Sequence, residues 1–164
     1  MNILVCISKA PDTTAKISFT ENNTKFNEDK VQFIVNPYDE WYALVRGLEL
    51  KEANGGTVTT ISVGGPDLDP IIRKALAIGA DKAVRVNAEA TDAFFVAKQI
   101  AEFAKDKGFD LILAGKETIN YNGSQVGAMV AELLDMPYVS IASKLEMEGS
   151  KATIHRDAPG GEEV

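Results

Sequence analysis

The stretch DLILAGKETINYNGSQVGAMVAELL, residues 110–134, predicts a strand, a polar loop and a helix in succession. Residues 111–114 form a continuous apolar run of the kind that fills a parallel sheet covered on both faces, and Gly115 ends it. From Val126 onward the apolar positions recur at helical spacing, so we expect a helix that begins near Ser124, with the Ser124 hydroxyl as its N-cap. The stretch therefore predicts one strand–helix unit of an α/β fold.

The start of this helix is a candidate site for an anion. A helix N-terminus presents unpaired N–H groups and about half a positive charge, which suits a phosphate. Gly123 and Gly127 let the backbone approach a ligand without a Cβ in the way. Most strand–helix junctions bind nothing, however, and neither a GxGxxG pattern nor a Lys-Ser/Thr pair sharpens the signal here. The junction by itself leaves nucleotide binding and a purely structural loop both open.

Composition limits the class of protein. The 164 residues are 45% hydrophobic and 25% charged, which predicts one soluble domain with a real core. The net charge of −7 argues against nucleic acid as a partner, because phosphate binding needs clustered Lys and Arg. A single cysteine excludes an internal disulfide framework. The apolar run at residues 1–7 is too short for a signal peptide or a membrane span, so we expect a cytoplasmic protein without membrane insertion.

Three strand–helix units precede residue 110. We expect strands at residues 3–7, 57–63 and 82–86, and helices at residues 37–53, 68–80 and from Asp92 to about 105. Asn36 is the expected N-cap of the first helix, Pro37 its first residue, and Asp39 and Glu40 complement its positive end. Residues 16–33 alternate in polarity around a turn at residues 21–24, which predicts an inserted β-hairpin or extended arm.

After residue 137 the pattern becomes extended again. Residues 138–143 predict a fifth strand, and residues 144–154 predict a hairpin that turns at Glu148 and Gly149. His155, the only histidine, is expected on an edge strand at the surface, because no partner suggests a catalytic triad.

Strands that alternate with helices predict a doubly wound parallel sheet, whose ligand site lies at the carboxyl ends of the strands where strand order reverses. The first and fourth strands should flank that point. Three loops then converge on one crevice, namely residues 6–8, 64–65 and 120–127, and Asn36 and Pro37 close its side. This convergence favours a bound nucleotide. No nucleophile–base pair, metal cluster or Walker lysine accompanies it, so we expect the nucleotide to be held rather than hydrolysed, with no catalytic or metal-binding residues.

At these residues the sequence resembles the β subunit of electron transfer flavoprotein, along almost the whole chain. The motifs that carry the resemblance are ILVCI at 3–7, NPYDE at 36–40, SVGGP at 62–66, IRKALAIGAD at 72–81, DLILAG at 110–115 and QVG at 125–127. The resemblance implies an adenine nucleotide alpha hydrolase-like (Rossmann-like) sheet and a heterodimer with an FAD-carrying α subunit. It also implies AMP, or a second FAD in bifurcating members, in this subunit. Such a complex carries electrons from flavin dehydrogenases to a further acceptor, and this subunit is not itself an enzyme.

The resemblance also assigns nucleotide-binding residues. They are Cys6, Asn36, Pro37, Tyr38, Asp39, Gly64, Asn120, Tyr121, Asn122, Gly123, Ser124, Gln125, Val126, Gly127, Ala128, Met129, Val130 and Ala131. Judged from its neighbours alone, Cys6 is a small apolar side chain inside a strand, because no His or second Cys lies within sequence reach.

Two departures from the family pattern affect these expectations. Many members carry an acidic loop before QVG, whereas residues 120–124 here are neutral, which bears on the choice between AMP and FAD. The family chain also continues well past residue 164, through the segment that docks onto dehydrogenases. We therefore expect a truncated form that lacks this segment, and whose uncovered sheet edge and apolar surface favour weak self-association.

Two other classes on the same fold are alternatives. A stand-alone nucleotide-binding module of the universal stress protein type places two close glycines before a Gly-Ser pair, whereas Gly115 here has no close partner before Gly123. An ATP-dependent ligase needs a Ser-Gly-Gly-type phosphate loop after the first strand, and residues 8–11 do not supply one.

Overall fold

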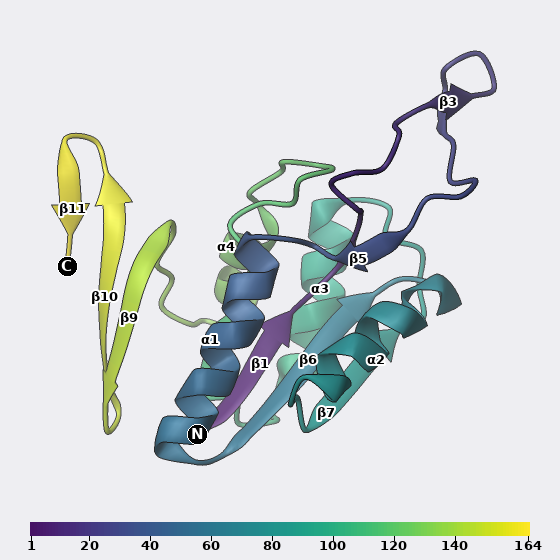
Figure 1. Ribbon diagram of the computed structural model, residues 1–164. Helices are drawn as coiled ribbons and strands as arrows, with labels where there is room; N and C mark the ends of the chain where they lie inside the picture. Colours follow the sequence, from purple (N-terminus) through teal and green to yellow (C-terminus); the bar gives the residue numbers. More distant parts are fainter.

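A four-stranded parallel sheet forms the centre of the molecule in the computed structural model, which describes residues 1–164 (Figure 1). Its strands lie in the order β7 (Lys82–Val86), β6 (Thr57–Val63), β1 (Asn2–Cys6) and β8 (Leu111–Leu113). The chain moves outward from β1 through β6 to β7, and then crosses to the other side of β1 to form β8. Strand order therefore reverses between β1 and β8, as the sequence predicts.

Helices cover both faces of this sheet, which confirms the doubly wound α/β fold (Figure 1). Helices α1 (Asp39–Asn54) and α2 (Asp69–Ala77) pack on one face, and α3 (Ala93–Ala104) and α4 (Val126–Leu133) on the other. Successive residues of a strand point to opposite faces. Ile3 and Val5 accordingly lie in the core under α1 and α2, whereas Leu4 and Cys6 lie in the core under α3 and α4.

The segment between β1 and α1 forms the predicted hairpin. Strands β3 (Phe19–Thr20) and β4 (Lys25–Phe26) pair antiparallel at the tip of an arm that extends from the body (Figure 1). The turn between them contains three consecutive residues with positive φ, Glu21 to Asn23. At its base, β2 (Lys9–Pro11) and β5 (Phe33–Val35) form a second antiparallel pair that the sequence did not predict.

The end of the chain departs from expectation. The predicted fifth strand at residues 138–143 is wrong for residues 138–141, where the chain is irregular and Ile141 has a φ of 56°, and residues 142–143 belong to a strand outside the parallel sheet. Instead β9 (Ala142–Glu148), β10 (Lys151–Ala158) and β11 (Gly161–Glu163) form a separate antiparallel sheet. The β9–β10 hairpin with Gly149 in its turn is confirmed. An antiparallel partner only a few residues away costs little loop entropy, which explains why this strand pairs locally.

The three-stranded sheet is fixed to the body through α1. The Arg46 guanidinium donates to the Leu145 carbonyl oxygen at 2.6 Å, and Leu145 and Met147 pack against the core under α1 and α2. His155 lies on β10, the central strand of this sheet, so the prediction of an edge strand is wrong. Its ring Nδ1 is 2.6 Å from the Glu162 carboxylate on β11.

Two helix boundaries also differ from prediction. Helix α1 begins at Asp39 rather than Pro37, because Tyr38 takes a φ of 64° and breaks the helical path before it. A short 3₁₀ turn, η1 (Pro66–Leu68), precedes α2, and α2 ends at Ala77 rather than Ala80 because Gly79 has a φ of 129°. None of the helices combines the length and the hydrophobicity needed to span a lipid bilayer.

Candidate functional site

The candidate site lies where the carboxyl ends of β1 and β8 meet. The structure brings the turn at residues 36–39 against the loop that follows β8. The Asp39 carboxylate accepts a hydrogen bond from the Glu117 backbone N–H at 3.0 Å. Gly115 packs so closely that an added Cβ would lie 3.1 Å from the Asp39 Cβ and 2.7 Å from the Glu40 Cγ. Segments far apart in the sequence therefore form one surface at this end of the sheet.

Asn36 is the most informative of the predicted residues. Its side chain is fully buried, at 0% exposure, and it does not act as the N-cap of α1, so that prediction is wrong. The side-chain oxygen accepts from the Ile119 backbone N–H at 3.5 Å, which turns the amide toward the loop after β8. The side-chain Nδ2 has no hydrogen-bond partner. A buried donor without a partner costs about 1 to 3 kcal/mol, so this N–H group is suited to a ligand acceptor.

The start of α4 also differs from prediction. Ser124 has a φ of 52° and its hydroxyl donates to the Glu117 carboxylate at 3.2 Å, so it is not the N-cap. The residue that precedes the helix is Gln125, which makes no side-chain capping hydrogen bond. Helix α3, by contrast, is capped by the Asp92 carboxylate, which accepts from the Phe95 N–H. The first amides of α4 therefore have no side-chain acceptor, and the loop of residues 120–125 that leads to them is exposed.

Other predicted residues divide into two groups. Tyr38 and residues 120–125 are exposed, and Gly127 has room around it, since an added Cβ would lie 3.5 Å from the Tyr138 ring. Val126, Met129, Val130 and Ala131 are partly or fully buried, and the first three pack in the core under α3 and α4. The side chains of the second group hold α4 against the protein core.

Gly64 lies at the carboxyl end of β6, as expected, but the space beside it is already occupied. A Cβ at this position would lie 2.5 Å from the Leu68 Cδ1 of η1. The Gly64 carbonyl oxygen accepts from the Arg85 guanidinium at 3.3 Å. The close approach that requires a glycine here is therefore made by Leu68.

Cys6, the last residue of β1, lies in the core under α3 and α4. Burial, with a smaller contribution from the nearby Glu40 charge, raises the pKa of its thiol to about 12. A thiol in this state stays neutral and unreactive, which agrees with its interpretation as a small apolar side chain.

Glu40 is a buried side chain at the candidate site that the sequence pattern indicated only as a charge at the helix end. It is 8% exposed, and its carboxylate accepts from the Ser8 backbone N–H at 2.5 Å and from the Ser8 hydroxyl at 2.9 Å. Burial raises the pKa of Glu40 to about 7, the hydrogen bonds from Ser8 oppose that rise, and the Asp39 charge adds to it. The sequence contains one indication that Glu40 is buried. It lies four residues before the buried Leu44, so both residues share the inner face of α1.

The candidate site is acidic. Asp39, Glu40 and Glu117 place three carboxylates around the end of β8. Lys116 forms an ion pair with Glu117 at 2.9 Å, and this hydrogen-bonded contact lowers the pKa of Glu117. A phosphate that binds here must rely on backbone amides and neutral side chains more than on basic ones.

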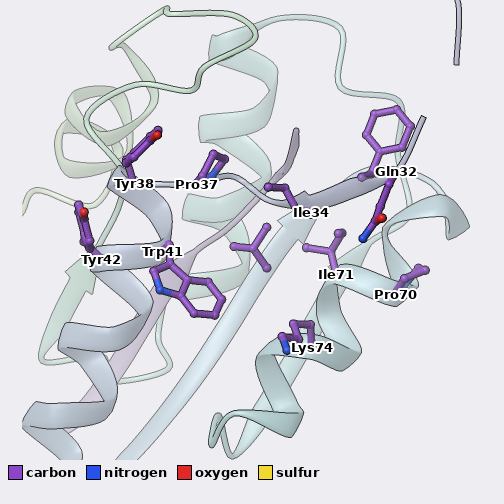
Figure 2. Close-up of a pocket in the computed structure, with 11 residues that line it drawn as sticks. Gln32, Ile34, Pro37, Tyr38, Trp41, Tyr42, Pro70, Ile71 and Lys74 are labelled. Atoms are coloured by element: carbon purple, nitrogen blue, oxygen red, sulfur yellow. The ribbon is translucent and has the colours of Figure 1, made fainter. Parts of the chain in front are cut away.

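A groove lies beside the candidate site rather than in it. This groove of about 690 Å³ runs between α1 and α2 over β5, and Figure 2 shows the Trp41 and Ile71 side chains in it. Its lining residues are Gln32, Phe33, Ile34, Val35, Pro37, Tyr38, Trp41, Tyr42, Pro70, Ile71 and Lys74. Only Pro37 and Tyr38 belong to the predicted set, so the sequence did not predict this groove.

Comparisons with protein-family models and with curated proteins identify the same family. The family model of the electron transfer flavoprotein domain matches residues 23–164. The electron transfer flavoprotein subunit beta of Bacillus subtilis is 38% identical, over 98% of this chain and 63% of the relative. The caffeyl-CoA reductase-Etf complex subunit CarD of Acetobacterium woodii is 35% identical, over 100% of this chain and 64% of the relative. Protein FixA of Azorhizobium caulinodans is 32% identical, over 100% of this chain and 62% of the relative. The chain thus spans just under two thirds of the length of these curated relatives.

Proposed function

Because this chain belongs to the electron transfer flavoprotein family, we propose that it acts as a β-type subunit, which binds AMP or FAD in the crevice between β1 and β8. Together with an FAD-carrying α subunit, it transfers electrons from flavin dehydrogenases to a downstream acceptor. This chain serves as scaffold and nucleotide binder rather than as an enzyme.

One observation carries the nucleotide part of the proposal. The fully buried Asn36 amide has an Nδ2 without a partner, and its oxygen is turned toward the loop after β8. Buried polar groups in folded proteins are nearly always hydrogen-bonded, so a ligand acceptor such as a ribose hydroxyl, ring nitrogen or phosphate oxygen fits this position. The uncapped amides at the start of α4 support the same assignment, because they favour a phosphate.

The residues present fit an adenine nucleotide in two parts. The amides of Val126, Gly127 and Ala128 would hold phosphate oxygens, and Asn36 would fix a polar edge of the nucleoside. Tyr38, which is 58% exposed beside Asn36, offers an aromatic ring to the same ligand. A bound FAD supplies redox chemistry to the complex, whereas AMP has no redox-active group and would act structurally. The chain's own task is to hold the nucleotide and to present a surface to its partner.

The first experiment identifies the nucleotide. The full-length protein is purified with its partner and denatured, and the released nucleotides are separated and quantified. One AMP and one FAD per heterodimer indicate simple electron transfer, and two FAD indicate a bifurcating type. One FAD and no AMP per heterodimer, which is no nucleotide beyond the FAD of the α subunit, would overturn the proposal.

A variant connects that result to the site. Asn36→Leu keeps the branched shape of the side chain but removes the buried amide, so we expect loss of the nucleotide held by this chain. Asn54→Leu, at the exposed end of α1, is the control and should keep its nucleotide. Equal nucleotide content in the Asn36→Leu variant and the parent would contradict the assigned position.

A further inference from the structure

Glu40 is a buried carboxyl group that connects the two strands at the reversal of strand order. Its carboxylate holds Ser8, the second residue after β1, through the backbone N–H and the hydroxyl. Its stem fills the space beside Gly115 after β8, where an added Cβ would lie 2.7 Å from the Glu40 Cγ and 3.0 Å from its backbone nitrogen. Glu40 therefore positions both edges of the proposed nucleotide crevice.

No cation neutralises this carboxylate. The titratable groups that act on it are Cys6 on β1 and Asp39 on α1. The charged residues next in sequence to its contacts Ser8 and Gly115 are Lys9 on β2, and Lys116 and Glu117 after β8. Lys9 pairs with Asp67 at 2.5 Å and Lys116 pairs with Glu117 at 2.9 Å, and neither lysine forms an ion pair with Glu40. Burial and the neighbouring Asp39 charge both raise the pKa of Glu40, to about 7. The group therefore changes charge at neutral pH.

The contacts of Glu40 tolerate both protonation states. When ionised, the carboxylate accepts from the Ser8 N–H and from the Ser8 hydroxyl. When protonated, one oxygen still accepts from the N–H and the other donates to the hydroxyl oxygen, because a hydroxyl can donate or accept. Protonation therefore removes a negative charge from the crevice without loss of the contacts that position Ser8.

We propose that Glu40 couples nucleotide binding to the uptake of a proton. An anionic phosphate that enters the crevice meets the Glu40 carboxylate, and the complex is more stable when that carboxyl group takes a proton from solvent. This inference rests on the proposed function, since it requires that the crevice bind a nucleotide. It makes Glu40 a positioning residue whose charge sets the pH range of tight binding.

The test measures binding of two probes to the full-length protein from which nucleotide has been removed. The first probe is the methyl ester of adenosine monophosphate, whose phosphate carries one fixed charge between pH 6 and 8. The second is adenosine, which has no phosphate. With the pKa of Glu40 near 7 in the free protein, binding of the ester should weaken about fivefold to tenfold from pH 6 to pH 8. Adenosine should bind equally at both pH values.

Glu40→Gln reproduces the protonated form, because the Gln carbonyl accepts from the Ser8 N–H and the Gln amide donates to the hydroxyl. It should bind the ester equally at pH 6 and pH 8. Glu49→Gln, an exposed carboxylate on the same helix, should keep the full pH dependence of the parent. Calorimetry of the parent in two buffers of different ionisation enthalpy should also show proton uptake with the ester at pH 7.5, and this measurement needs no variant.

The outcomes separate the two proposals. Equal binding of the ester by the parent at both pH values, or the same loss in Glu40→Gln as in the parent, overturns the role of Glu40 and leaves the nucleotide site intact. An equal loss for adenosine also overturns it, since the effect would then not involve phosphate charge. If neither probe binds at any pH, the proposed function fails, and this inference fails with it.

Discussion

Replacement of Glu40 by Gln should stabilise the folded protein, and the gain should grow with pH. Burial raises the pKa of this carboxyl group from the ordinary value of 4.5 to about 7. Between these two values the folded state binds the proton more tightly than the unfolded state. The stability linked to this proton is therefore complete below about pH 4.5 and is lost as pH rises through 7.

The size of the effect follows from the two pKa values. The difference between 4.5 and about 7 corresponds to a loss of about 3 kcal/mol in the free energy of unfolding once pH is well above 7. About 2 kcal/mol of this loss falls between pH 5.5 and pH 8.5. A glutamine at this position is neutral throughout and keeps both contacts with Ser8, so it avoids the loss.

Urea unfolding at pH 5.5 and at pH 8.5 measures this prediction. The free energy of unfolding of Glu40→Gln minus that of the parent should increase by about 2 kcal/mol between the two pH values. Glu49→Gln, on the exposed face of α1 and paired with Arg46 at 2.8 Å, is the matched control and should change stability by less than about 1 kcal/mol at either pH. The same Glu40→Gln difference at both pH values would refute the view that Glu40 is ionised in the crevice at high pH.

Three further predictions concern the same end of the sheet. Gly115→Ala should lower the free energy of unfolding, measured by thermal melts, by about 1 to 3 kcal/mol, because the new Cβ would lie 2.7 Å from the Glu40 Cγ and 3.0 Å from the Glu40 backbone nitrogen. Gly123→Ala is the control and should have little effect, because the space around Gly123 is open. Cys6 should resist iodoacetamide at pH 8 in the folded protein and react only after unfolding, since burial raises its pKa to about 12; rapid labelling of the native chain would contradict this. Gly127→Asp should weaken nucleotide binding, since like charges about 4 Å apart repel by roughly 1 to 4 kcal/mol at effective dielectric constants of 80 to 20. Retained nucleotide in Gly127→Asp would argue against a phosphate at the start of α4.

Local sequence patterns determined most of the fold. Strands β6 and β7 begin and end at the predicted residues, because β-branched runs there are bounded by glycine or by polar residues. The alternation of these strands with helical periods predicted the parallel sheet and the reversal of strand order between β1 and β8. The hairpins were also predicted, since a turn and its two strands lie within a few residues of each other.

The predictions that failed required knowledge of distant contacts. The pattern at residues 138–143 is compatible with a strand, but only tertiary structure decides whether such a segment joins the parallel sheet or leads into the separate sheet of β9. Ser124 is of a residue type that often caps helices, yet its hydroxyl donates a hydrogen bond to the Glu117 carboxylate instead. Asn36 likewise has a capping side chain, and packing buries it beneath the loop after β8.

The sequence by itself determined the order of the strands and helices of the parallel sheet, the type of fold, and the end of the sheet at which we propose a ligand site, because each depends on local propensity and on the general topology of strand–helix units. Tertiary structure alone decided that Glu40 is buried, that Asn36 has an amide N–H group without a partner, and that a groove lies between α1 and α2. The physical reason is desolvation. Whether a polar group loses its water depends on side chains brought against it from remote parts of the chain, and that loss sets both the pKa of Glu40 and the need of Asn36 for an acceptor.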